Sequence, residues 1–196
     1  MWNVSALEAH EVAPERIRPL RRLEFEKLVE LGVFEDERVE LLRGALVTMP
    51  PTDPSHDRSV SELAKLLYAT LSDRADVRVQ CSFAASDDSE PLPDLVVAPA
   101  ASASWTAHPD AALLVVEVAG TSLRKDRGVK AVLYGSVAVR EYWIVNVSRG
   151  TVEVFRSRDG DGNWATRLTF GRGDTIAIEA FPDVAIAVDR IVPPLV

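Results

Sequence analysis

Cysteine is nearly absent from this chain of 196 residues, which contains Cys81 alone. A single thiol excludes an internal disulfide and a cysteine-rich metal site. Long hydrophobic runs are missing as well, so we expect no segment that spans a bilayer. The N-terminus lacks the basic region, apolar stretch and cleavage site of a secretory signal. These absences predict a cytoplasmic protein with no membrane partner, because thiols stay reduced in that compartment.

Positive charge is also scarce. The chain has 22 lysines and arginines against 30 aspartates and glutamates, a net charge of -8 at pH 7. A strongly basic nucleic-acid-binding surface is therefore not expected, although net charge says little about the field inside one cleft. Hydrophobic residues make up 47% of the chain, which fits a sizeable core. No repeat or linker is visible, so we expect an N-terminal arm over residues 1–20 and a single domain over residues 21–196.

The spacing of apolar residues predicts an α+β fold, with helices flanking a central mixed β-sheet. A short helix is expected around residues 23–31, an N-terminal hairpin around Arg43-Gly44 and an amphipathic helix over roughly residues 55–73. Later, Gly120-Thr121-Ser122 offers capping groups for a helix that runs to about Gly135. The expected strands, which end in a C-terminal β-meander, are 77–84, 94–98, 113–118, 142–147, 151–157, 164–170 and 175–178.

Two acids lie in apolar runs that are typical of strands. Asp94 follows Pro93 and precedes Leu-Val-Val, and Glu117 has valines on both sides. An ionised carboxylate in a buried strand is costly unless it is paired or holds a metal. Neighbouring strands can bring two such acids to one end of a sheet, where oxygen ligands suit Mg2+ or Mn2+ with waters in the remaining positions. We therefore predict that Asp94 and Glu117 are catalytic metal ligands.

A helix face adds a positive charge near these acids. Asp126, Lys130 and Tyr134 are spaced four residues apart, so they share one face of a helix. Lys130 can there orient an attacking water or neutralise a phosphorane-like transition state. Taken alone, Asp126 and Lys130 are better explained as a surface ion pair, and Asp94 as part of a turn. Together with Glu117, these features favour a site for metal-assisted phosphodiester hydrolysis.

The two acids belong to longer segments that read PDLVV and LLVVEVAGTSLRKDRGVKAVLYGSVAVREYWIVN. Upstream, a further segment reads VELLRGALVTMPPTDPSH, in which an acid, a glycine hairpin, a Met-Pro pair and a histidine follow one another. Together these segments resemble the Uma-two family, described as "putative restriction endonucleases" of the PD-(D/E)XK nuclease superfamily, over roughly residues 20–190. The resemblance implies a restriction-endonuclease-like core with a divalent-metal site, in which Asp94 matches the first acid and Glu117 the second.

The chain departs from the usual superfamily pattern at one position. A lysine normally follows two residues after the second acid, and here that residue is Ala119. The resemblance implies that Lys130, on the following helix, takes over the role of this lysine. Glu40 matches the acid before the hairpin of the family, and it either reaches the metal or its water or is an ordinary cross-strand charge.

Three further residues have both a functional and an ordinary interpretation. His56 follows the proline-rich loop and can contact a phosphate or assist proton transfer, although a structural role at the helix start is the stronger alternative. Gln80 can touch the site from the strand before Asp94, although a solvated strand face explains it better. Tyr134 either lines the cleft or packs its ring with the hydroxyl in water.

We expect a metal-dependent DNA endonuclease-like enzyme that hydrolyses phosphodiester bonds with Mg2+ or Mn2+. The alternative is a catalytically weak or inactive nuclease-fold module that binds nucleic acid or a protein partner, which the acidic balance and the displaced lysine favour. Cutting both strands of a duplex generally needs two sites, so a homodimer is expected. Residues 1–20 and the C-terminal segment 192–196 are apolar enough to pack on a partner.

Overall fold

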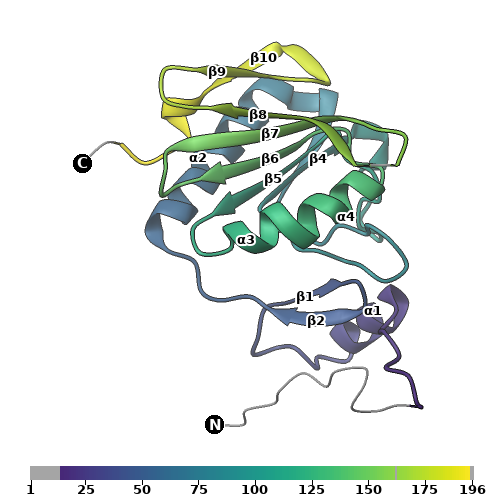
Figure 1. Cartoon of the computed structure of the whole chain (residues 1–196). Coiled ribbons are helices and arrows are strands. Elements are labelled where there is room, and N and C mark those ends of the chain that lie inside the picture. The colour runs from purple at the N-terminus through teal and green to yellow at the C-terminus, as the bar shows by residue number, and fades with distance from the viewer. Residues whose placement is uncertain (1–13, 162, 195–196) are drawn as a thin grey trace.

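The fold is built around a mixed sheet in the order β3-β4-β5-β6-β7-β8 (Figure 1), as seen in a computed structural model that describes residues 14–161 and 163–194. Strands β5 and β6 run parallel, and every other neighbouring pair in this sheet is antiparallel. The α+β class with a central mixed sheet is thus confirmed. The strands are β3 (Ala75–Val79), β4 (Leu95–Pro99), β5 (Leu114–Ala119), β6 (Tyr142–Asn146), β7 (Thr151–Arg158) and β8 (Trp164–Phe170).

One face of the sheet is covered by helix α2 (Pro54–Leu71), as the amphipathic pattern predicted. Its start is fixed by Asp53, whose side chain accepts hydrogen bonds from the backbone N–H groups of Ser55 and His56. Leu63 and Leu67 are fully buried and belong to the same core as the sheet residues Val116 and Trp143. This packing places the first turn of α2 at the edge of the sheet where the functional candidates gather.

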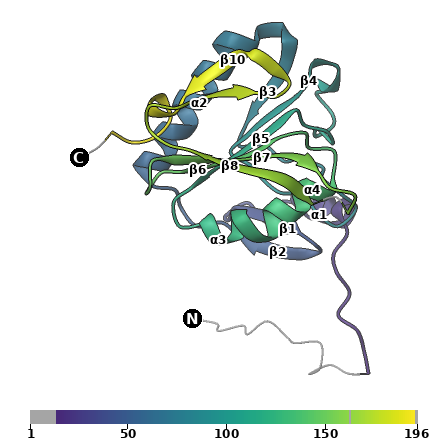
Figure 2. The same ribbon diagram turned by 45° about the horizontal axis from the view of Figure 1, so that its top comes forward.

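The opposite face is covered by a helical segment (Figure 2). The central turn of this segment is π-helical. The segment comprises α3 (Leu123–Lys125), the π-helical turn η4 (Asp126–Lys130) and α4 (Ala131–Ser136). The predicted helix is therefore confirmed, but its π-helical turn was not expected from the sequence. Turns of this kind occur frequently at functional sites. Here the turn holds Asp126 and Lys130, both of which are buried.

An N-terminal unit packs beside this body and contributes one wall of the candidate site (Figure 1). It consists of α1 (Arg22–Glu30) and the hairpin of β1 (Val39–Leu42) with β2 (Ala45–Thr48), both of which the sequence predicted. Arg43 and Gly44 form the hairpin turn with positive φ angles of 50° and 77°. Two backbone hydrogen bonds between Leu41 and Glu90 attach the hairpin to the rest of the chain.

Two strand predictions need correction. The strand expected over 77–84 occupies Ala75–Val79, because Gln80 has a positive φ of 48° that ends the extended backbone. The strand β9 (Thr175–Ile178) was predicted, but its partner β10 (Phe181–Ala187) was not. A register irregularity between Phe181 and Ala185 interrupts the alternation that would have revealed β10. Short 3-10 turns occupy η2 (Ser72–Arg74), η3 (Ala100–Ser102) and η5 (Val188–Arg190).

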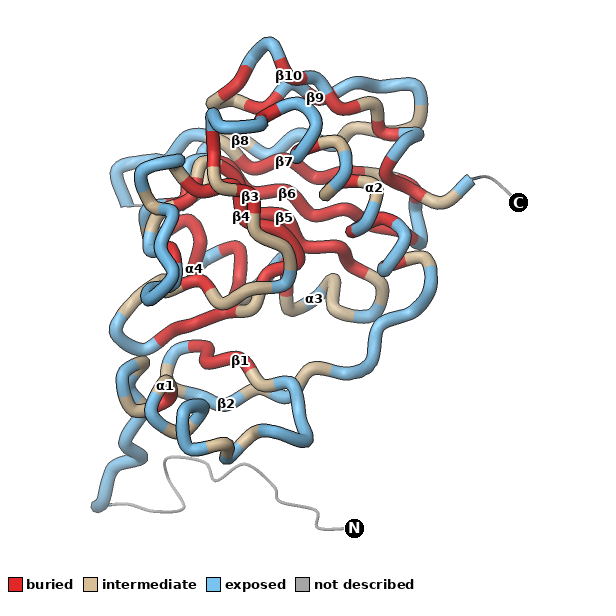
Figure 3. Tube along the Cα trace, turned by 180° about the vertical axis from the view of Figure 1, so that it is seen from behind, coloured by how far each residue is buried: buried red, intermediate tan, exposed pale blue. Residues whose placement is uncertain are grey.

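Burial follows this layered arrangement, with the central strands enclosed between the helices (Figure 3). Residues 14–20 form neither helix nor strand, which agrees with an extended arm, while residues 1–13 of that arm lie outside the described part. Val192 is buried in the chain's own core, so it does not present an apolar face to a partner as expected. Among the described residues, no helix is both long and apolar enough to cross a membrane.

Candidate active site

The two predicted metal ligands meet at one end of the central sheet. Strands β4 and β5 are antiparallel, with Leu95 opposite Val116, so the residue before β4 lies beside the end of β5. This register brings Asp94 close to Glu117, and Asp94 Oδ2 accepts a hydrogen bond of 2.8 Å from the backbone N–H of Val118. Both acids line one cavity of about 70 Å³.

Lys130 points into this cavity from the π-helical turn. Its Nζ lies 2.8 Å from Glu117 Oε1 and 3.0 Å from Glu40 Oε2. Tyr134, one helical turn further, donates a hydrogen bond of 2.8 Å from its hydroxyl to Glu117 Oε1. The shared helix face of Lys130 and Tyr134 therefore looks toward the second acid, as the four-residue spacing predicted.

The low-dielectric surroundings shift the ionisation of this cluster. Burial raises the pKa of Glu117 to about 8, and the carboxylates of Asp126, Asp94 and Glu40 add to the increase, while Lys130 opposes it. Burial alone would raise the pKa of Glu40, but Lys130 and Lys125 hold it below its usual value. Without a further cation, the lysines therefore stabilise the carboxylate of Glu40, and Glu117 retains a proton near neutral pH.

Glu40 joins the site from strand β1 of the N-terminal hairpin, although it lies more than fifty residues before Asp94 in the sequence. Its Oε1 lies 2.5 Å from Lys125 Nζ, and its Oε2 accepts a hydrogen bond from the backbone N–H of Leu92. Glu40 is completely buried. The contact of Lys125 with Glu40 was not predicted from the sequence, because only the fold places Lys125 opposite the hairpin.

His56 lies in the same cavity, at the first turn of α2. Its Nε2 is 3.1 Å from Asp94 Oδ1, and its Nδ1 is 3.2 Å from Asp57 Oδ1. Burial alone would lower the pKa of His56, but the two aspartates outweigh it and raise that pKa. His56 thus fixes the orientation of the Asp94 carboxylate from the side opposite to Val118.

Asp126 also lines the cavity and is 1% exposed. Its Oδ2 accepts a hydrogen bond of 2.6 Å from the Ser122 hydroxyl. In the described part of the chain, its Oδ1 is buried with no hydrogen-bond partner. Burial raises the pKa of Asp126, as expected for a carboxyl group removed from water. An orphaned buried oxygen of this kind is an available acceptor for a cation or its bound water.

Gln80 is a predicted site residue whose side chain does not line the cavity. It is exposed just beyond β3, and only its backbone N–H reaches the region, donating a hydrogen bond of 2.9 Å to the carbonyl of Asp94. Ala119, where the usual pattern has a lysine, is fully buried in β5. The nearby ammonium group is instead that of Lys130.

The donor set suits a hydrated divalent cation better than a cage made of protein ligands. Within residues 14–161 and 163–194, no three histidine, cysteine, aspartate or glutamate side chains lie close enough together to hold a metal between them. Mg2+ commonly takes one or two carboxylates and keeps several waters. Asp94 and Glu117 provide such a pair beside the unpartnered oxygen of Asp126. The cavity of about 70 Å³ has the volume of roughly two liquid-water molecules.

Comparison with known proteins places this arrangement in a family. The Uma2 family, described as "Putative restriction endonuclease", matches residues 23–189. The chain is also similar to a crystal structure of "a putative nuclease belonging to DUF820" from Anabaena variabilis ATCC 29413, with a TM-score of 0.70 and 15% sequence identity over 88% of this chain and 97% of that chain. At that identity, the likeness shows a shared fold. No curated protein matches the chain.

Proposed function

Because the chain belongs to the Uma2 family, we propose that it is a Mg2+- or Mn2+-dependent endonuclease that hydrolyses phosphodiester bonds of DNA. The observation that carries the proposal is the convergence of Asp94, Glu117 and Lys130 in one cavity, from two neighbouring strands and the next helix. Two carboxylates and an ammonium group at one sheet end provide the charges that metal-assisted phosphodiester hydrolysis needs.

In the proposed mechanism, Asp94 and Glu117 would hold the divalent cation, which would act as a Lewis acid and would lower the pKa of a bound water. The ammonium group of Lys130, 2.8 Å from Glu117, stabilises the negative charge that develops on the phosphate. Glu40 and Tyr134 are positioning residues: Glu40 contacts Lys130, and Tyr134 hydrogen-bonds to Glu117. His56 orients Asp94 through its Nε2.

A second candidate function is a catalytically weak or inactive nuclease-fold module that binds nucleic acid or a protein partner. It is favoured by the engagement of both Asp94 oxygens, one with His56 and the other with the backbone N–H of Val118. A cation at this site must compete with His56 for Asp94. Loss of the lysine at the position of Ala119 points in the same direction.

The proposed enzyme is a homodimer, since cleavage of both strands of a duplex generally requires two sites. Exposed apolar side chains on and after α1 offer a contact surface; Leu23 is 70% exposed and Leu31 is 68% exposed. Light scattering at micromolar concentration should give twice the chain mass of 21.5 kDa. A monomeric mass under these conditions contradicts the dimer and leaves the single-chain site intact.

Millimolar Mn2+ is expected to raise the melting temperature of the wild-type protein, because a ligand that binds only the folded state stabilises it by about 2.7 kcal/mol at 100 times its dissociation constant. The shift should grow as the pH rises toward 8, since the cation must displace the proton of Glu117. Differential scanning fluorimetry measures this shift. Asp94→Asn should lose the Mn2+-induced shift in melting temperature. Asp36→Asn, at an exposed position that does not line the cavity, should keep this shift. An equal shift in Asp94→Asn contradicts a site built on Asp94.

A further inference from the structure

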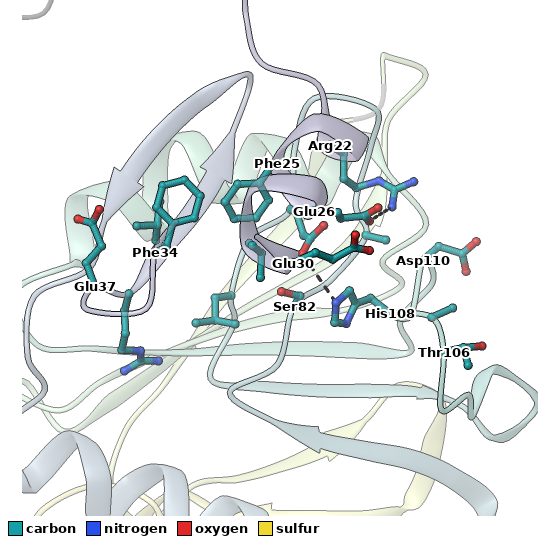
Figure 4. Close-up of a pocket in the computed structure, with 17 residues that line it drawn as sticks. Arg22, Phe25, Glu26, Glu30, Phe34, Glu37, Ser82, Thr106, His108 and Asp110 are labelled. Atoms are coloured by element: carbon teal, nitrogen blue, oxygen red, sulfur yellow. Dashed lines mark hydrogen bonds and ion pairs between the residues drawn. The ribbon is translucent and has the colours of Figure 1, made fainter. Parts of the chain in front are cut away.

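A second and much larger cavity lies on the other side of the N-terminal unit, between α1 and the loop that precedes β5 (Figure 4). Its volume is about 710 Å³. Arg22, Phe25, Glu26 and Glu30 come from α1, and His108 lies on the loop across the cavity. Arg38 lines both this cavity and the candidate active site, so the two are neighbours. We call this hollow the α1 cavity.

Carboxyl groups outnumber positive groups in the α1 cavity. Five acids line it, against the two arginines Arg22 and Arg38; the acids are Glu26, Glu30, Glu37, Glu90 and Asp110. Arg22 is already engaged, because its guanidinium bonds to Glu26 and to the Ser86 carbonyl. This excess of negative charge disfavours a phosphate group and favours a cation. The α1 cavity is therefore not a continuation of a DNA-binding surface.

Glu90 is a buried acid in the wall of the α1 cavity. It is 3% exposed, and backbone hydrogen bonds to Leu41 hold it in place at the cavity wall. In the part of the chain that the structure describes, its Oε2 is buried without a hydrogen-bond partner. A buried carboxyl oxygen without a partner costs free energy that a bound hydrogen-bond donor would recover.

The groups that face Glu90 do not neutralise it. Glu26 and Arg22 approach from α1, Ser82 from the segment after β3, and His108 from the opposite loop, with its Nε2 3.9 Å from Glu90 Oε1. Burial, with the nearby Glu26 carboxylate, raises the pKa of Glu90 to about 7. Burial also lowers the pKa of His108, so this imidazole is largely uncharged at neutral pH. A positive group bound beside Glu90 would therefore stabilise its ionised form.

Aromatic side chains supply an apolar wall beside these acids. Phe25 and Phe34 have ring centroids 5.8 Å apart and an interplanar angle of 33°, and the two rings lie side by side in Figure 4. A planar cation with several N–H donors fits this combination, because a guanidinium stacks on aromatic faces and pairs with two carboxyl groups at once. An ammonium group matches the charge but lacks the planar surface.

We propose that the α1 cavity binds a guanidinium group carried on an aliphatic stem, with its N–H groups on Glu90 and Glu26 and its plane against Phe25 and Phe34. The group can come from a free alkylguanidine or from an arginine side chain of a protein partner. The chemistry required is the same in both cases. The proposal does not depend on phosphodiester cleavage, since none of these four residues lines the candidate active site.

Isothermal titration calorimetry of the full chain at pH 8 tests the proposal with two probes, agmatine and the peptide Gly-Arg-Gly amide. At least one of them should bind, and Gly-citrulline-Gly amide, its uncharged isostere, should bind at least about tenfold more weakly than the arginine peptide. Binding of agmatine alone identifies a free alkylguanidine as the source. Binding of the arginine peptide alone identifies a partner's side chain, and either result supports the guanidinium site.

Glu90→Gln should weaken probe binding at least about tenfold, because it removes the buried negative charge while keeping the shape of the side chain. Asp36→Asn removes an exposed charge that does not line the cavity and should change affinity less than about twofold. Phe34→Ala should also weaken binding through loss of the aromatic wall.

Lowering the pH from 8 to 6 should weaken probe binding to the wild type, since Glu90 gains a proton around pH 7. The same change of pH should affect probe binding to Glu90→Gln less.

Three results overturn the proposal. The first is the absence of binding by both guanidinium probes at millimolar concentration. The second is equal affinity of wild type and Glu90→Gln. The third is measurable binding of both the arginine and the citrulline peptide with equal affinity, which would indicate that the cavity recognises an uncharged hydrogen-bonding group instead.

Discussion

Replacing Lys130 by alanine is expected to lower the free energy of unfolding by about 3–5 kcal/mol, the usual cost of removing one partner of a buried ion pair. Lys130 is 1% exposed and lies between Glu40 and Glu117, which are themselves buried. Without its ammonium group, two carboxyl groups remain in a low-dielectric cavity with only Lys125 beside Glu40. Urea denaturation of the metal-free protein at pH 8 measures the loss.

Two controls separate charge from packing in this experiment. Lys130→Met keeps most of the apolar stem and removes the charge, so it should lose nearly as much stability as Lys130→Ala. Lys125→Ala removes a partly exposed partner of Glu40 and should cost less, about 1–2 kcal/mol. The lysines hold the folded-state pKa of Glu40 below 4.5, so the stability that Glu40 contributes is lost as the pH falls through that lowered pKa. The difference in the free energy of unfolding between wild type and Lys130→Ala should become smaller as the pH falls through this pKa. Equal stability of the two proteins at pH 8 would contradict the buried ion pairs of Lys130 with Glu40 and Glu117.

Glu117→Gln is expected to reduce DNA cleavage by about 100-fold or more while leaving the metal-free fold nearly as stable as the wild type. The loss of cleavage follows from removal of a proposed metal ligand. Stability should change little because burial holds the pKa of Glu117 at about 8, so the wild-type carboxyl already carries a proton near neutral pH. Glutamine keeps an oxygen for the Tyr134 hydroxyl, and Lys130 keeps its contact with Glu40.

The pH dependence of stability gives this variant a second signature. Between pH 4.5 and 8 the native wild type holds a proton on Glu117 that the unfolded chain has released, so the stability of the wild type should fall as the pH rises through this window. Glu117→Gln should lack that contribution. Glu62→Gln, in the middle of α2 and outside the active-site cavity, is the control for loss of one acid. Cleavage by Glu117→Gln at the wild-type rate would remove Glu117 from the mechanism.

The sequence alone was sufficient to predict which residues converge in the candidate site. Glu117 stood out because valines flank it on both sides, and a lone acid in such a run requires a reason. Successive apolar runs placed Asp94 on a neighbouring strand, and the antiparallel register then brings it to the same end of the sheet. The four-residue spacing of Lys130 and Tyr134 predicted a common helix face, and both side chains contact Glu117.

Other features depend on contacts between distant segments, which local patterns do not encode. The pairing of Glu40 with Lys125 requires the hairpin to dock against Glu90 through Leu41. Strand β3 ends early because Gln80 has a left-handed backbone conformation. Glutamine rarely adopts this conformation, so the residue type did not predict it. The π-helical turn that begins at Asp126 likewise depends on packing with a distant strand. The backbone carbonyl of Asp126 accepts a hydrogen bond from the hydroxyl of Tyr142 on β6.

The α1 cavity could not be predicted from the sequence either, because it too is formed by distant segments. Glu90 lies in a polar segment that the sequence indicates only as a turn, and neither its burial nor its missing partner can be read from neighbouring residues. Its surroundings come from α1 and from the loop around His108, which are more than seventy residues apart in the chain. Only the folded structure brings these groups around one carboxyl group.

Cleavage of supercoiled plasmid DNA by the purified full chain tests the central claim most directly. Reactions with Mg2+, with Mn2+ and with EDTA are compared for the wild type and for Asp94→Asn, which keeps the size of the side chain and removes its charge. The account predicts nicked or linear product from the wild type with at least one of the two ions, no product with EDTA, and a loss of about 100-fold or more in Asp94→Asn. Cleavage that persists undiminished in Asp94→Asn, or no cleavage by the wild type with either ion, would contradict it.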